Sequence, residues 1–145
     1  MTKTVLIEEP GRWYVGRWPV QDSSKVLRSL RKAAVSEPRF VSLSISSNEV
    51  SLVAPAGLRI RPRPKKTSKN WSLLRFEGTL DFALVGVLAR LTKVLAEASI
   101  SVFVVSTYDT DFVLLKAKTM TKARRVLLKA GYALKTGKRA VRDSK

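Results

Sequence analysis

Six residues between two apolar runs carry side chains that could bind a small charged molecule. The stretch STYDTD, residues 106–111, follows the run SISVFVV, and its last residue begins the run DFVLLK. Apolar runs of this length predict strands, so the six residues should form the turn between them. Its hydroxyls and carboxylates could bind an amino group or a cationic side chain; the candidates are Ser106, Thr107, Asp109, Thr110 and Asp111. The same residue types favour turns by bonding their own backbone, an alternative that suits Asp111 least because it begins the second run.

The composition excludes much of the usual chemistry of enzymes. The chain has no cysteine and no histidine, which removes disulfides, thiol chemistry, the commonest general base and the commonest transition-metal ligand. The eleven acidic residues are mostly scattered, without the spacing of metal ligands or of paired carboxylates. An enzyme that uses Lys93 or Lys116 with a nearby acid has no supporting spacing either. We therefore expect neither an enzyme nor a cofactor.

The charge is strongly basic and unevenly distributed. Twenty-eight lysines and arginines against eleven acids give a net charge of +17, which predicts attraction to polyanions. Most of the basic residues lie in the segment 59–69 and in residues 116–145. Candidate polyanion contacts are Arg61, Arg63, Lys65, Lys66, Lys122, Arg124, Arg125 and Lys129. Such a surface, without interleaved aromatic residues, predicts weak and salt-sensitive binding or only a solvated face.

The first half of the chain predicts strands and one helix. With 145 residues, 45% of them apolar, the chain can bury a core. TVLIEE and RWYVGRW predict two strands joined as a hairpin at Pro10-Gly11, a turn dipeptide. Apolar residues at helical spacing predict a helix from Asp22 to before Pro38. RFVSLSISS and EVSLVAP predict a second hairpin.

The second half predicts an ordered series of elements. The series is a strand at residues 71–78, a helix over Leu84–Ala98, strands on either side of STYDTD, a helix over Met120–Ala130 and a short strand at residues 132–134. This β-α-β-β-α-β order is the ferredoxin-like arrangement, and the first half repeats most of it. The sequence therefore predicts an α+β fold of tandem ferredoxin-like units, with antiparallel sheets and helices on one face.

Residues 77–115 carry a resemblance to a known family. EGTLDFALVGVLARLTKVLAEASISVFVVSTYDTDFVLL, with the segments that flank it, resembles the small two-module ACT-domain proteins, which are related to the regulatory modules of aspartate kinase and to the CASTOR-type arginine sensor. The most specific part is STYDTD with the helix start Gly86-Val87-Leu88 before it. The resemblance implies tandem ACT modules, an incomplete one at 1–58 and a second one at 71–134. Residues 59–70 and 135–145 do not belong to the family pattern. Prolines and a dense charge run predict that 59–70 is an exposed, mobile linker, and 135–145 is a basic tail.

The resemblance also implies where a ligand would bind. ACT ligands lie between modules, so a site made by the loop before the long helix and by STYDTD is expected, in a homodimer. Backbone N–H groups at the start of that helix favour a carboxylate. Gly86 lacks a Cβ, which would allow a ligand or a neighbouring backbone to come close. The alternative is that Gly86 only allows the helix to pack on its sheet. The expected ligand-binding residues are Asp81, Leu84, Val85, Gly86, Val87, Ser106, Thr107, Thr110 and Asp111.

Two functions from different classes follow. The first is a non-catalytic regulatory sensor that binds a free amino acid, either apolar or basic. The alternative is a basic protein that binds nucleic acid or an anionic surface through its linker, late helix and tail, with Trp13, Trp18 or Trp71 available for stacking if exposed. No apolar run approaches the roughly 18 residues of a membrane span, and none resembles a signal peptide, so we expect a cytoplasmic protein without a membrane span.

Overall fold

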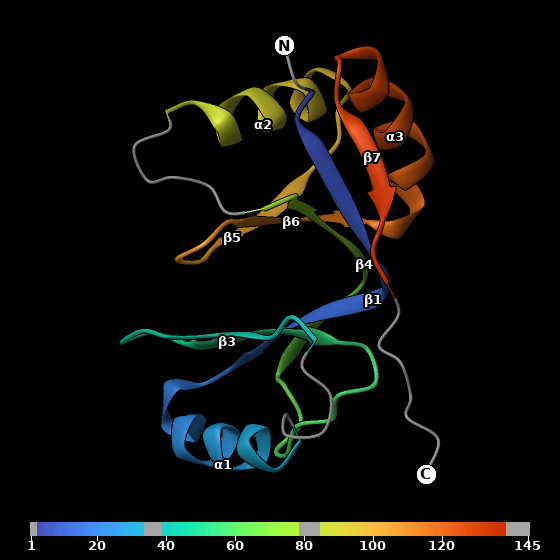
Figure 1. Cartoon of the computed structure of the whole chain (residues 1–145). Helices are drawn as coiled ribbons and strands as arrows, with labels where there is room; N and C mark the ends of the chain where they lie inside the picture. Colours follow the sequence, from blue (N-terminus) through green and yellow to red (C-terminus); the bar gives the residue numbers. More distant parts are fainter. Residues whose placement is uncertain (1–2, 34–38, 79–84, 139–145) are drawn as a thin grey trace, which may run out of the picture. The chain divides into compact units, whose positions relative to one another are not determined.

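The computed structural model of the chain describes residues 3–33, 39–78 and 85–138 (Figure 1). Its main elements in chain order are β1 (Val5–Trp18), α1 (Ser23–Ala33), β2 (Ser42–Ile45), β3 (Val50–Pro55), β4 (Lys66–Phe76), α2 (Val87–Glu97), β5 (Val102–Ser106), β6 (Asp111–Lys116), α3 (Met120–Lys129) and β7 (Ala133–Thr136). Single 3-10 turns at Val20–Asp22 and Ala117–Thr119 precede α1 and α3. The chain forms two compact units: unit 1 is Met1–Pro10 with Trp71–Lys145, and unit 2 is Gly11–Asn70.

Unit 1 contains the predicted series β4-α2-β5-β6-α3-β7. Its strands lie in the order β7-β1-β4-β6-β5. β6 pairs antiparallel with both β4 and β5, whereas β7 pairs parallel with the start of β1. The parallel pair departs from the expected all-antiparallel sheet, because the first strand of the chain takes the place beside β4 that the last strand of a ferredoxin-like unit would occupy.

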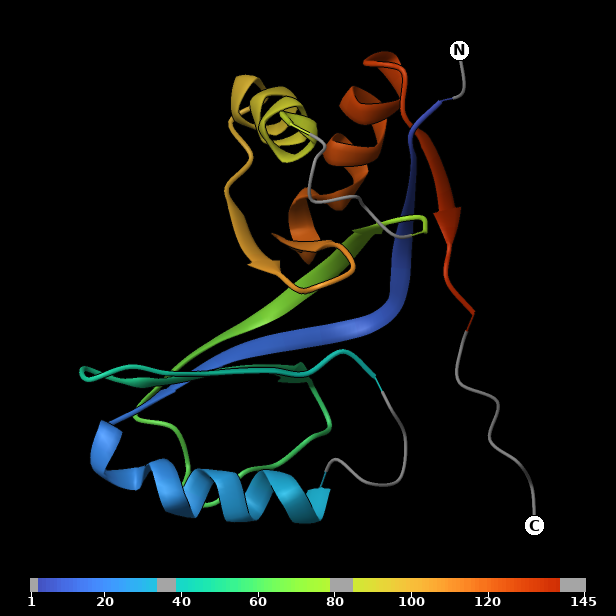
Figure 2. The ribbon, with the colours of Figure 1, turned by 60° about the vertical axis from the view of Figure 1, so that its left-hand side comes forward.

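The core of unit 1 lies between its sheet and helices α2 and α3. Figures 1 and 2 show both helices on the same face of the sheet. The helical spacing of apolar residues correctly predicts their buried faces, Leu91 and Leu95 on α2 and Met120, Ala123 and Leu127 on α3. These side chains pack against Leu6, Leu74, Phe76, Val113 and Leu115 of the sheet. The helices are therefore held by burial of apolar surface.

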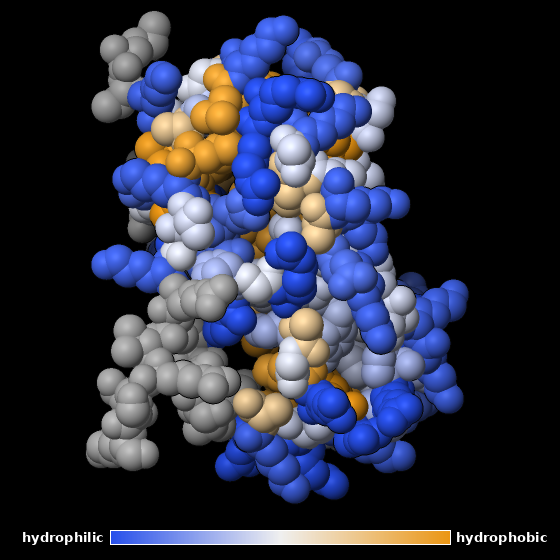
Figure 3. Space-filling view, turned by 90° about the vertical axis from the view of Figure 1, so that its right-hand side faces the viewer, coloured by the Kyte–Doolittle hydropathy of each residue, from blue (hydrophilic) through white to orange (hydrophobic). Residues whose placement is uncertain are grey.

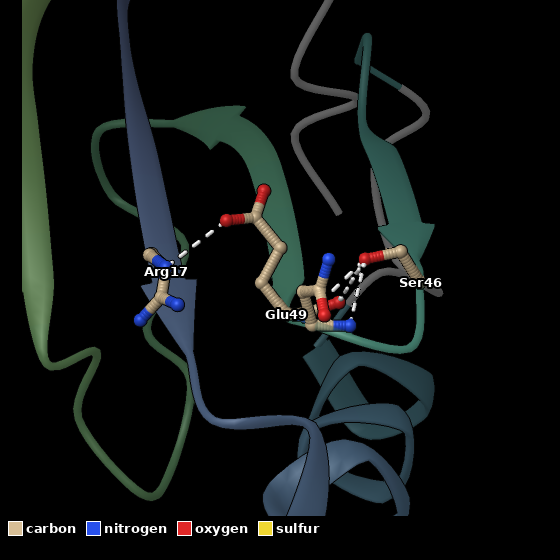
Figure 4. Close-up of polar contacts among 4 residues, drawn as sticks. Arg17, Ser46 and Glu49 are labelled. Atoms are coloured by element: carbon tan, nitrogen blue, oxygen red, sulfur yellow. Dashed lines mark hydrogen bonds and ion pairs between the residues drawn. The ribbon is translucent and has the colours of Figure 1, made fainter.

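Unit 2 is built from the second part of β1, α1, β2, β3 and the start of β4. Its strands lie in the order β2-β3-β1-β4, and β3 pairs antiparallel with both β1 and β2. The predicted β2–β3 hairpin is thus confirmed. Its turn is closed by the Ser46 hydroxyl, which accepts the N–H groups of Asn48 and Glu49 at 3.2 Å, and Arg17 Nε donates to Glu49 Oε2 at 3.0 Å (Figure 4). The unit 2 core comprises Trp18, Val26, Val50, Leu52, Ala54 and Ile60.

The hairpin predicted at Pro10-Gly11 is wrong. β1 runs through this dipeptide as one strand, with Gly11 at a φ of 105°. The residues before it pair with β7 from Val5 to Glu8, and those after it pair with β3 from Trp13 to Trp18. Each half therefore finds its hydrogen-bond partners in a different unit instead of in the other half.

The linker expected at residues 59–70 is exposed along most of its length, but it belongs to unit 2 and does not connect two units. Residues 66–70 belong to β4, and Ile60 is only 4% exposed in the unit 2 core. Residues 1–10 lie in unit 1 together with the C-terminal elements, so unit 2 is inserted within unit 1. The compact units therefore differ from the linear division at 1–58, 59–70 and 71–134. Of the expected tail, residues 139–145 lie outside the described residues. No helix in the described ranges is long and apolar enough to cross a membrane.

Candidate functional site

The topology of unit 1 places two predicted parts of the site at one edge of its sheet. β4 and β5 are both antiparallel to β6, so their C-terminal ends lie at the same edge. The start of α2, which follows β4 in the chain, and the β5–β6 turn are drawn on the same side of unit 1 in Figure 1. Asp81 and Leu84, two of the expected ligand-binding residues, lie outside the described residues.

Helix α2 begins without a side-chain cap among the described residues. Gly86 is its N-cap, in the left-handed conformation with φ 81° and ψ 2°, and its carbonyl accepts Arg90 N–H at 3.0 Å. The first N–H groups of an α-helix have no acceptor within the helix, and the helix dipole places partial positive charge there. The first turn of α2 contains no acidic residue to offset it. Val85, just before the cap, is 94% exposed. This helix end can therefore accept an anion such as a carboxylate.

The requirement for glycine at position 86 comes from its backbone conformation. A Cβ built there would meet no described atom within 4 Å, so the alternative that Gly86 only allows close packing of the helix on its sheet is not supported. A φ of 81° is instead a value that residues with a Cβ rarely adopt. Close approach of a ligand to this position stays a prediction.

The β5–β6 turn uses most of its polar groups internally. Ser106 and Asp111 are paired at the ends of the two strands, and the Ser106 hydroxyl donates to Asp111 Oδ1. Thr107 N–H donates to Thr110 O at 2.9 Å, the Thr107 hydroxyl donates to the same oxygen at 3.0 Å, and Thr110 N–H donates to Thr107 Oγ1 at 3.4 Å. Turn chemistry thus accounts for Ser106 and Thr107.

Carboxylate oxygen remains at this turn for a ligand. Within the described ranges, the structure gives Asp111 Oδ2 and the exposed Asp109 no hydrogen-bond donor. Tyr108, at the tip, is 81% exposed, a residue that sequence reasoning missed although an aromatic residue inside a polar turn was the available signal. The turn therefore presents negative charge beside an aromatic ring, on the edge where α2 begins.

The basic residues of α3 divide into paired and unpaired ones. Arg124 donates two hydrogen bonds to the Glu8 carboxylate, from Nε to Oε2 at 2.9 Å and from Nη2 to Oε1 at 2.7 Å. These hydrogen bonds raise the pKa of Arg124, against the opposing effect of burial. The role of Arg124 as a phosphate contact is therefore weakened. Lys122, Arg125 and Lys129 are exposed, and the structure shows no ion pair for them within its described residues; Figure 3 shows the largely hydrophilic face that carries α3.

The basic residues of unit 2 are gathered around a hollow. Arg61 and Arg63 line it together with Arg59 and Lys69, which sequence reasoning did not single out as contacts. Lys65 and Lys66 are exposed but do not line it. The condition for tryptophan stacking, that the rings be exposed, is not met, because Trp13, Trp18 and Trp71 are at most 9% exposed. No group of acidic residues in the described ranges could hold a metal ion.

Comparison with known proteins supports the fold. The family model of the ACT domain matches residues 66–129. No curated protein matches the chain. Protein Atu0741 from Agrobacterium tumefaciens has a similar structure, with a TM-score of 0.78 and 22% identity over 97% of this chain and 98% of that one.

Two further similar structures come from aspartate kinases. The regulatory subunit of aspartate kinase from Thermus thermophilus, in its ligand-free form, has a TM-score of 0.63 and 10% identity over 86% of this chain and 95% of that one. Aspartate kinase from Clostridium acetobutylicum, described as an allosteric enzyme, has a TM-score of 0.63 and 14% identity over 87% of this chain and 34% of its own. At these identities the likeness establishes a shared α+β fold.

Proposed function

We propose that this chain, with an ACT-domain match over residues 66–129, is a non-catalytic regulatory protein that binds a free amino acid at the edge of unit 1. One observation carries the proposal: α2 begins at Gly86 without a capping side chain among the described residues, on the sheet edge that also presents Asp111. A free amino acid has complementary charges, because its carboxylate suits the N–H groups of α2 and its ammonium group suits the carboxylates of the turn.

The rest of the site would come from a second module. Unit 2 has the strand order β2-β3-β1-β4, which is that of a ferredoxin-like unit without its second helix, and this supports its interpretation as an incomplete ACT module. β5 is an edge strand of the unit 1 sheet, and an open edge favours pairing with a second copy. We therefore propose a homodimer in which the ligand lies between unit 1 of one copy and a module of the other copy.

Two classes of amino acid fit this edge. The exposed Val85 beside the helix start favours an apolar side chain. The carboxylates of Asp109 and Asp111 favour a basic one, because a second cationic group would gain a charge-assisted hydrogen bond. The occupant would change how the two modules pack, and hence what a regulated partner binds.

Calorimetric titration of the dialysed protein with each of the twenty amino acids tests this function. We expect one or two apolar or basic amino acids to bind with little dependence on salt. Asp111→Asn keeps an acceptor for Ser106 but removes the charge, so it should weaken binding about tenfold. Glu97→Gln, at an exposed acid on the other end of α2, is the matched control. No binding at millimolar concentration, or equal affinity in Asp111→Asn, would refute the proposal.

The polyanion alternative has its own supporting observation. Lys122, Arg125 and Lys129 are exposed on α3. The structure pairs Glu8 with Arg124 of the same helix and shows no acidic partner for these three among its described residues. We expect a short DNA duplex to bind weakly, with an affinity that falls steeply as salt rises. Replacing all three by glutamine should lower both the affinity and its salt dependence, whereas an unchanged salt dependence would exclude α3 as the contact.

A further inference from the structure

An open hollow in unit 2 gathers four cationic side chains. It has a volume of about 410 Å³, and its charged lining residues are Arg59, Arg61, Arg63 and Lys69. The other described lining residues are Tyr14, Ala56, Leu58, Ile60, Pro64 and Thr67, so no acidic side chain among the described residues lines it. Small-molecule sites in proteins commonly have volumes from about 300 Å³ upward, so the hollow is large enough for a metabolite.

The sequence RIRPRP explains how the arginines come to line one hollow. Arg59, Arg61 and Arg63 are exposed, whereas Ile60 between them is 4% exposed and packs in the unit 2 core. Alternation of arginine with an apolar residue or proline thus separates a charged side of the segment from a packed side. Pro64 contributes to the wall, and its ring restricts the backbone.

The segment that carries these arginines is anchored along its length. Tyr14 Oη donates to Leu58 O at 2.7 Å, and Trp18 Nε1 donates to Pro62 O at 2.7 Å. Arg61 N–H donates to Ser29 Oγ at 2.9 Å, and Lys65 N–H donates to Arg17 O at 2.8 Å. A ligand would therefore meet arginines whose backbone is already ordered, which lowers the entropic cost of binding.

The three arginines at the hollow have no acidic partner among the described residues. In these ranges, the structure shows no ion pair for Arg59, Arg61 or Arg63, and Glu49 of the same unit is bound to Arg17. Gathering like charges around one hollow costs free energy unless an anion occupies it. The planar fork of arginine binds phosphate through paired hydrogen bonds. Multiple phosphate groups are the ligand chemistry that these side chains favour.

The uncharged lining residues are suited to a flat, largely apolar group. They include Tyr14, Leu58 and Pro64, and burial raises the pKa of the Tyr14 hydroxyl above its ordinary value. A nucleobase is flat and stacks on aromatic rings and on guanidinium planes. The lining therefore combines residues that suit phosphate with residues that suit a base.

We propose that this hollow binds a nucleoside di- or triphosphate. Arg59, Arg61, Arg63 and Lys69 contact its phosphates, and its base lies against Tyr14, Leu58 and Pro64. The site lies wholly in unit 2 and is independent of the amino-acid site proposed in unit 1. Bound nucleotide would give the regulator a second input.

Calorimetric titration with ATP, GTP, inorganic triphosphate and adenosine tests this site in the full chain. We expect at least one nucleotide to bind, inorganic triphosphate to compete with it more weakly, and adenosine alone not to bind. Arg61→Gln with Arg63→Gln should weaken nucleotide binding by at least about tenfold, because two charged contacts are lost. Arg28→Gln with Arg31→Gln, which removes two exposed arginines of α1 that do not line the hollow, should leave it unchanged.

Several results would overturn the proposal. Absence of nucleotide binding at millimolar concentration refutes the site, and triphosphate that binds as tightly as ATP and GTP refutes the base contact. An equal loss in the control variant Arg28→Gln with Arg31→Gln shows general attraction to polyanions instead. Displacement of the nucleotide by a DNA duplex that binds through Lys122, Arg125 and Lys129 shows the same. Thermal melts check that the double variant folds; if it does not, Arg59→Gln, at another exposed side chain, serves as the test variant.

Discussion

Replacing Ile60 by alanine tests whether the segment before β4 is a packed part of unit 2. Ile60 is 4% exposed in the cluster that contains Trp18, Val26 and Leu52, so the variant loses buried apolar surface and leaves a cavity. Such substitutions cost roughly 2 to 5 kcal/mol, and we expect a loss of about 3 kcal/mol in the free energy of unfolding. For a chain of this length, that loss lowers the melting temperature by roughly 6 to 12 °C.

The matched control is Ile45→Ala at the end of β2. Ile45 is 49% exposed, so its truncation removes less transfer free energy and opens no enclosed cavity. We expect a loss of about 1 kcal/mol or less. Urea denaturation followed by tryptophan fluorescence measures both variants, since Trp18 lies in the same core cluster as Ile60. Equal losses in the two variants, or a loss below about 0.5 kcal/mol for Ile60→Ala, would show that residues 59–65 form a loosely attached connection.

Three further predictions concern single residues. Gly86→Ala should cost about 1 kcal/mol of stability in urea denaturation because its φ is 81°, and Gly86→Asn should cost less. Burial raises the pKa of Tyr14 above its ordinary 10.0, so the stability this group contributes is fully present below pH 10.0 and is lost as pH rises through the raised value. Urea denaturation below pH 10.0 and above the raised pKa measures this change. The free energy of unfolding should fall less between these two pH values in Tyr14→Phe than in the unaltered protein. Arg124→Gln should cost less than about 1 kcal/mol, and less at high salt, because the pair with Glu8 is partly exposed; Lys122→Gln should cost nothing measurable.

Most elements of the fold could be predicted because burial imposes a period on the sequence. The apolar positions of α2 and α3 repeat at helical spacing, and the structure buries these faces. The spacing of apolar residues does not show which strands pair with one another. Pro10-Gly11 has the composition of a turn, but both sides find partners in other strands, so β1 continues through it. The charge of residues 59–69 outweighed Ile60 in the sequence pattern, yet Ile60 packs in the unit 2 core and hydrogen bonds anchor the segment on either side of it.

The candidate site could be predicted in its position but not in its hydrogen bonding. The order β-α-β-β-α-β places the start of α2 and the β5–β6 turn at one sheet edge, whatever residues they contain. Turn geometry decides which hydroxyls remain available to a ligand, and the Thr107 hydroxyl donates to the Thr110 carbonyl oxygen. The hollow in unit 2 could not be predicted, because it depends on the contact of Tyr14 with Leu58, residues far apart in the chain.

Amide NMR of the labelled protein, titrated with whichever amino acid gives the largest calorimetric signal, tests the central claim most directly. We predict chemical-shift changes at Gly86, Val87 and residues 106–111 that saturate together, with little change in unit 2. Binding that shifts only unit 2, or no saturable shift with any amino acid, would contradict the assignment of this edge as an amino-acid site.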